Sequence, residues 1–186
     1  MEAHKRIGEL LRESVVEDCS VDISYHNTSW KESPLTPTET KCVIPFPGTA
    51  QFLDSLLESV EEGMVDDMIA RGETGKLYLD FDFKRWLREA YVPAIERRII
   101  QAGMPGVKLR LLEVWTPTTF GAYDTMLFGA LDKEDAHRID PNDEGLNYAL
   151  EELLDIDDWY EDFFAELLDS YPLEEFCYED TEEGWH

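Results

Sequence analysis

The spacing of apolar residues predicts three helices in the first two thirds of the chain. Apolar side chains recur every three or four residues in 4–17, 50–71 and 83–102, which is the repeat of an amphipathic helix. Gly72 directly follows the second stretch and is a typical helix-ending residue. Pro93 falls inside the third stretch, where it predicts a kink or a division of the helix because proline lacks a backbone N–H.

Alternation of apolar and polar positions predicts strands between these helices. The period of two is present in 20–26, 41–46, 76–81 and 106–115, and a further strand is predicted within 119–131. Strands and helices that follow one another in this way are typical of an α+β fold. We therefore expect a small sheet of four or five strands that is packed by helices.

The last third of the chain has a different pattern. Apolar residues recur every three or four positions from 149 to 171, which predicts one long helix or two in succession, ended by Pro172. We therefore expect two parts: an α+β domain over 1–133 and an acidic helical C-terminal segment over 134–186 that packs on it.

Charge separates these two parts. The chain has 42 Asp and Glu against 16 Lys and Arg, a formal net charge of −26 at pH 7. Residues 134–186 hold 20 acids and only Arg138 as a base, a net charge of −19, whereas residues 1–133 hold 22 acids and 15 bases, a net charge of −7. Concentrating so much charge of one sign costs self-repulsion, which favours a functional reason for it.

The polar side of the C-terminal stretch is a row of carboxylates. If 134–186 fold as two antiparallel helical stretches, its acids are spread over about 40 Å, or about one per 2 Å. Duplex DNA carries one charge per about 1.7 Å of its axis, so such a row would attract a cleft built for a phosphate backbone. A solvated helix face without a partner explains the same pattern. The residues that we expect to act as phosphate surrogates are Glu151, Glu152, Asp155, Asp158, Glu161, Asp162, Glu166 and Asp169.

In composition and size the chain resembles the anti-restriction and anti-CRISPR inhibitors of phages and plasmids. The resemblance implies a DNA mimic that is no enzyme, and whose partner is a basic nucleic-acid-binding protein of a restriction, CRISPR or other nuclease complex. The alternative is an immunity protein or antitoxin that blocks the basic active site of a toxin nuclease. Aromatic side chains that could anchor either interface are Trp159, Tyr160, Tyr171, Phe176, Tyr178 and Trp185.

Location is predicted from the cysteines and the hydropathy. The three cysteines are an odd number, lie far apart and have no CxxC spacing, which favours a reducing cytoplasmic compartment. No apolar run approaches the roughly 20 residues of a membrane span, and the basic N-terminus is not followed by the apolar region of a signal peptide. We expect neither a membrane nor nucleic acid as a direct partner.

Catalytic motifs are sparse. Phosphate-binding loops, dinucleotide-binding glycine motifs, nucleophile elbows and HExxH are absent, and the four histidines lack metal-ligand spacing, so we expect neither metal nor cofactor. Asp80 and Asp82, followed by Lys84, are compatible with a metal-dependent phosphoryl-transfer enzyme, although helix capping by Asp82 explains the pair as well. The basic residues of the third helix are expected to pair with acids on neighbouring helices.

Overall fold

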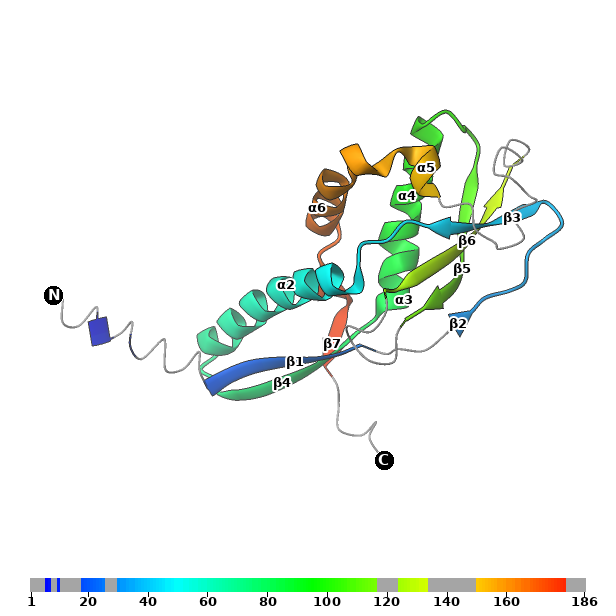
Figure 1. Cartoon of the computed structure of the whole chain (residues 1–186). Coiled ribbons are helices and arrows are strands. Elements are labelled where there is room, and N and C mark those ends of the chain that lie inside the picture. The colour runs from blue at the N-terminus through cyan, green and yellow to red at the C-terminus, as the bar shows by residue number, and fades with distance from the viewer. Residues whose placement is uncertain are drawn as a thin grey trace. The chain divides into compact units, whose positions relative to one another are not determined.

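The fold is known from a computed structural model of the whole chain (Figure 1). The structure describes residues 6–7, 10, 18–25, 30–116, 124–133 and 150–179. Contacts divide the chain into two compact units: unit 1 comprises 1–26, 53–82 and 173–186, and unit 2 comprises 27–52 and 83–172. The helix expected over 4–17 lies outside the described residues, apart from three single positions. The domain boundary expected between 133 and 134 is also not tested, because residues 134–149 lie outside the described residues, and it stays a prediction.

Unit 1 is built on a three-stranded sheet with the order β1-β4-β7. Strands β1 (Cys19–Tyr25) and β4 (Gly75–Phe81) pair in parallel, and the short β7 (Cys177–Glu179) pairs antiparallel with the end of β4. Helix α2 (Thr49–Ala70) contributes most of its length to this unit and ends before Gly72, which has a positive φ of 70°. A small apolar cluster between sheet and helix comprises Cys19, Val21, Val65, Met68, Ile69 and Leu77.

Unit 2 contains a four-stranded antiparallel sheet with the order β2-β5-β6-β3. Its strands are β2 (Trp30–Lys31), β3 (Glu39–Ile44), β5 (Lys108–Trp115) and β6 (Met126–Asp132). Strand β2 adds only two residues, so three strands form the body of the sheet. Helix α4 (Val92–Gln101) packs on β5, and helix α5 (Leu150–Leu154) contacts β3 (Figure 1).

The α+β class is confirmed, but the expectation of one small sheet is wrong. The strands form two sheets, because β1 pairs with β4 in unit 1 while β2 and β3, which lie between them in sequence, pair with β5 and β6 in unit 2. The alternation of apolar and polar residues along a strand indicates which side of the strand is buried, but it does not indicate which other strand will pair with it. The strands expected over 20–26, 41–46, 76–81 and 106–115 are all present.

The helix expected over 83–102 is continuous but irregular. It begins as α3 (Phe83–Trp86), widens into a π-helical turn (Leu87–Tyr91) and continues as α4 (Val92–Gln101). In the wide turn the Val92 N–H bonds the Leu87 carbonyl, five residues back. Pro93 follows immediately, and because proline cannot donate to the carbonyl four residues before it, the predicted irregularity is found here as a widened turn.

The core of unit 2 is a cluster of aromatic rings around Trp86, whose side chain is fully buried. The Trp86 ring lies 5.5 Å from Phe52, 5.6 Å from Tyr91 and 6.4 Å from Phe164, between ring centroids. Its indole N–H donates to the Tyr171 carbonyl at 3.2 Å. Buried Trp usually needs such an acceptor. The cluster therefore joins the start of α2, the α3–α4 helix and the C-terminal helix α6 (Tyr160–Ser170) into one core.

An ion pair on the larger sheet makes the stability of unit 2 depend on pH. Arg110 donates from Nε and Nη2 to the two carboxylate oxygens of Glu39, at 3.2 and 2.9 Å, and the Thr36 N–H donates to the same carboxylate at 2.7 Å. The Arg110 hydrogen bonds, followed by that of Thr36, lower the pKa of Glu39 from 4.5 to about 2. Ionised Glu39 therefore stabilises the fold above its unfolded pKa, and this contribution is lost as the pH falls from 4.5 towards 2.

We expect wild-type protein to be more stable than Glu39→Gln at neutral pH, and the difference to shrink towards zero near pH 2. Urea unfolding followed by circular dichroism across this range measures it. Glu73→Gln is the control, because the ion pair of Glu73 with Arg71 is half exposed and contributes little. A Glu39→Gln difference that is constant with pH would contradict the assignment.

Candidate functional site

The acidic C-terminal stretch folds as two helices in succession. They are α5 (Leu150–Leu154) and α6 (Tyr160–Ser170), separated by a 3₁₀ turn (Ile156–Asp158). Asp155 divides them with a φ of 49°, the left-handed conformation that Asp tolerates better than most residues. Residues 134–149 and 180–186 of the expected acidic segment lie outside the described residues, and 173–179 belong to unit 1.

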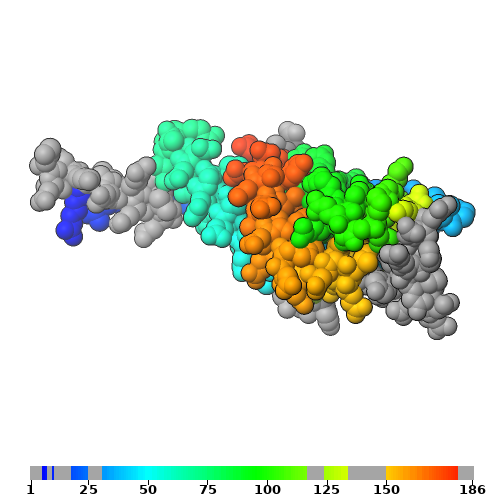
Figure 2. Space-filling model, turned by 90° about the horizontal axis from the view of Figure 1, so that it is seen from above, coloured from blue at the N-terminus to red at the C-terminus, as the bar shows by residue number. Residues whose placement is uncertain are grey.

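All eight carboxylates expected to form the site are exposed. We call them the acidic surface: Glu151 and Glu152 lie on α5, Asp155 and Asp158 lie in the connection, and Glu161, Asp162, Glu166 and Asp169 lie on α6. Figure 2 shows the segment 150–170, in yellow-orange to orange, uncovered on one side of α4. Among the residues that the structure describes, no Lys or Arg forms an ion pair with any of the eight.

Helical spacing aligns part of this surface. Asp162, Glu166 and Asp169 are four and three residues apart, so they form one stripe along α6. The opposite side of the helix carries Phe164 and Leu167, which are buried at 4% and 5% exposure. Packing of the apolar side of α6 therefore directs the carboxylate stripe toward solvent, and this orientation does not depend on a bound ligand.

Two tyrosines, Tyr91 and Tyr160, hold the start of α6 in place. The Tyr91 hydroxyl donates to the Pro45 carbonyl, and the Tyr160 hydroxyl hydrogen-bonds to that of Tyr91. Burial is the main reason that the pKa of each phenol is raised, so both remain neutral donors. The ring of Tyr160 also stacks on Phe164, with planes 12° apart. These contacts hold the start of α6 against the core of unit 2.

A cation also anchors the connection between α5 and α6. The Arg98 guanidinium of α4 lies 4.0 Å from the centre of the Trp159 ring, and the indole N–H of Trp159 donates to the Leu154 carbonyl at 2.7 Å. Arg98 thus stabilises the segment through the face of an aromatic ring and leaves the nearby carboxylates unpaired. Among the described residues, α4 therefore forms no ion pair with the acidic surface.

The aromatic residues expected to anchor an interface are divided between the two units, as far as the structure describes them. Trp159, Tyr160 and Tyr171 are half buried in unit 2, where the first two pack against neighbouring rings. Phe176 is buried in unit 1, Tyr178 is exposed there, and Trp185 lies outside the described residues. Aromatic residues at helical spacing serve the core here, as such residues commonly do.

Asp80 and Asp82 lie in unit 1, at the end of the central strand β4. Asp80 is buried at 8% exposure, and Asp82 is half buried with its N–H donating to the Phe176 carbonyl at 2.9 Å. Within the described part of the chain, no group of three or more His, Cys, Asp or Glu side chains is placed to hold a metal ion. Asp80 and Asp82 are therefore not part of such a group among the described residues.

The basic residues near α3 and α4 are only partly paired. Arg88 pairs with Glu32, which directly follows β2, at 2.7 Å, and Arg110 pairs with Glu39 in β3. Neither of these carboxylates lies on a helix as expected. Arg97 is exposed on α4 and forms no ion pair or hydrogen bond with the described residues. The sequence did not predict which of these arginines are paired, because the partners lie more than fifty residues away along the chain.

Fold and surface together define an α+β protein with an exposed acidic surface on two helices and their connection, unpaired among the described residues. Comparisons with protein-family models, with curated proteins and with solved structures found no match to the chain. In the part that the structure describes, every helix is too short or too polar to cross a membrane.

Proposed function

We propose that this protein is a cytoplasmic, non-catalytic inhibitor that occupies the nucleic-acid-binding cleft of a DNA- or RNA-binding protein, as anti-restriction and anti-CRISPR proteins of phages and plasmids do. The observation that carries the proposal is the acidic surface: eight exposed carboxylates, unpaired among the described residues, on helices whose apolar sides are buried. The role of these carboxylates is to take the place of backbone phosphates against Lys and Arg of the partner.

Charge spacing supports this role. Helix α6 has 11 residues and four of the carboxylates, so its length of about 16 Å carries on average one charge per about 4 Å. One strand of duplex DNA carries a phosphate every 3.4 Å or so. The density of negative charge along α6 is therefore similar to that of one DNA strand, for which the basic side chains of a nucleic-acid-binding cleft are spaced.

The net charge supports fast and salt-sensitive association. The chain carries −26, of which −19 resides in 134–186, so a basic partner is attracted over the Debye length of about 8 Å at physiological salt. Because the acids are exposed, their attraction is screened by added salt. Salt sensitivity is therefore the property that separates this mechanism from an interface held by buried apolar contacts.

The test is capture from nuclease-treated bacterial lysate on the immobilised chain, with elution in steps of rising salt and identification of the eluted proteins. We expect DNA- or RNA-binding proteins to elute together as the salt rises. Retention of a single partner at high salt would instead favour an immunity protein with a specific interface. Capture without any nucleic-acid-binding protein would contradict the proposed function.

A further inference from the structure

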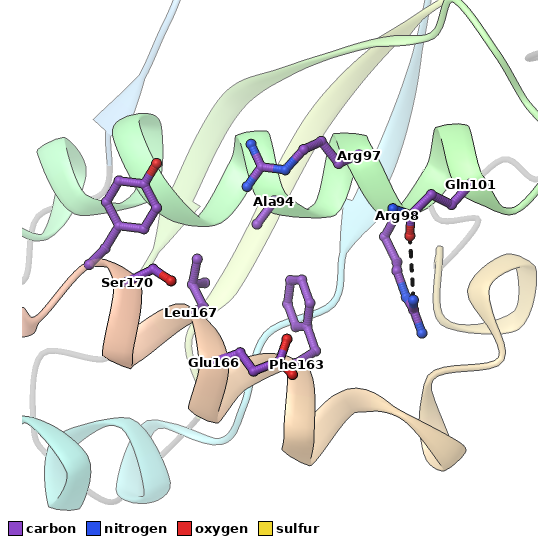
Figure 3. A pocket seen from close by; sticks show the side chains of 9 residues that line it. Ala94, Arg97, Arg98, Gln101, Phe163, Glu166, Leu167 and Ser170 are labelled. Carbon is purple, nitrogen blue, oxygen red and sulfur yellow. Dashed lines mark hydrogen bonds between the residues drawn. The ribbon is translucent and has the colours of Figure 1, made fainter.

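Helices α4 and α6 enclose a cleft of about 330 Å³ in unit 2 (Figure 3). Its floor is apolar and consists of Ala94 from α4 with Phe163 and Leu167 from α6. Its two rims have opposite charge, with Arg97 on α4 and Glu166 on α6 (Figure 3). Six of the nine lining residues carry polar or charged groups, so the cleft combines an apolar floor with a polar margin. Placed polar groups are what fix the orientation of a ligand in such a site.

Arg97 is the cationic group of this cleft that has no partner among the described residues. Its neighbour Arg98 is engaged, since it lies over the Trp159 ring and donates to the Gln101 side chain at 3.4 Å. The Arg97 guanidinium instead extends over Ala94 in Figure 3, and among the described residues nothing pairs with it. In a chain with 42 acids and 16 bases, a guanidinium beside an acidic helix without a carboxylate partner is open to a ligand.

Hydroxyl groups add to the polar margin. Ser170 and Tyr171 line the same cleft, and their hydroxyls form no hydrogen bond with the described residues. A guanidinium binds a carboxylate through two parallel hydrogen bonds, and nearby hydroxyls can donate to the same oxygens. Glu166 on the facing rim repels a doubly charged phosphate more than a singly charged carboxylate.

We propose that the α4–α6 cleft binds a small monocarboxylate with an apolar body. The carboxylate pairs with Arg97, and the apolar body covers Phe163 and Leu167. The cleft volume of about 330 Å³ lies at the small end of ligand sites and fits a molecule of about ten non-hydrogen atoms. This site shares Glu166 with the acidic surface but goes beyond the proposed function, which needs no small-molecule ligand.

The test uses phenylacetate as the probe and two-dimensional ¹H–¹⁵N NMR of the full chain at constant ionic strength. We expect saturable shifts of the amides of Phe163 and Leu167 and of the Arg97 side chain, with a dissociation constant on the order of 1 mM. Arg97→Gln should weaken binding by about tenfold or more, because it removes a charged hydrogen-bond donor. Arg97→Lys should weaken it less, since the charge remains but the paired geometry is lost.

Lys108→Gln is the matched control, because it removes one positive charge from an exposed position on β5 and should leave phenylacetate binding unchanged. The second probe is 2-phenylethylamine, which has the same ring and the opposite charge. Absence of phenylacetate shifts up to about 20 mM would overturn the proposal. Phenylacetate binding of unchanged affinity in both Arg97 variants would overturn it too, as would preferential binding of the amine that is lost in Glu166→Gln.

Discussion

Reversing four carboxylates of the acidic surface should lower the affinity for a captured basic partner on the order of 100-fold or more at physiological salt. The variant carries Glu152→Lys, Asp158→Lys, Asp162→Lys and Asp169→Lys. Each substitution removes an attraction and adds a repulsion, and the four together change the net charge from −26 to −18. Titration by fluorescence anisotropy or calorimetry at two salt concentrations measures the loss, which should be smaller at high salt because screening weakens both terms.

The control reverses the same residue types elsewhere. Asp54, Glu58, Asp66 and Asp67 are exposed on α2, and changing them to Lys gives the same net charge of −18. If total charge alone attracts the partner, both variants lose affinity alike. If the acidic surface is the site, the α2 variant loses far less. Equal losses would therefore contradict the site while leaving a role of charge in steering intact.

Asp155 is deliberately left out of this variant. Its φ of 49° is tolerated by Asp and Asn but costs more for Lys, so a reversal there would mix backbone strain with the loss of charge. Glu166 is also unchanged, because it lines the α4–α6 cleft. The four chosen substitutions change exposed side chains, including Asp158 in the connection between α5 and α6, and leave Asp155 and the proposed carboxylate site as they are.

Trp86→Ala should lower the free energy of unfolding of unit 2 by about 3–5 kcal/mol. Trp86 is fully buried, touches the rings of Phe52, Tyr91 and Phe164, and donates to the Tyr171 carbonyl. Its removal leaves a large cavity and an acceptor without its donor. Since domains are stable by only about 5–15 kcal/mol, this single change removes a large part of the total.

Urea unfolding followed by circular dichroism measures the loss. Trp115→Ala is the control, because that Trp is 52% exposed and should cost about 1 kcal/mol or less. Trp86→Phe keeps a ring in the cluster and should recover part of the stability. A loss at Trp86→Ala no greater than that at Trp115→Ala would show that the ring cluster is not the core of unit 2.

Local pattern predicted much of the fold from the sequence. The expected helix over 50–71 is α2 (Thr49–Ala70), and the expected strand over 76–81 is β4 (Gly75–Phe81). The exposure of the eight carboxylates was also predictable, because helical spacing separates them from Phe164 and Leu167. All of these features depend on side chains within a few residues of one another, which is the range that periodicity reports.

The sequence by itself thus determined the types of most elements, the irregular helix at Pro93 and the outward direction of the acidic surface. The tertiary structure alone decided that the strands form two sheets, that β7 joins β1 and β4, and that Trp159 serves packing with Arg98. It also decided that, among the described residues, Arg97 has no ion-pair partner, whereas Arg88 and Arg110 pair with carboxylates in 32–39. Strand pairing and side-chain partners depend on residues that are distant along the chain. The local periodicity of the sequence does not indicate which of those residues will be neighbours in space.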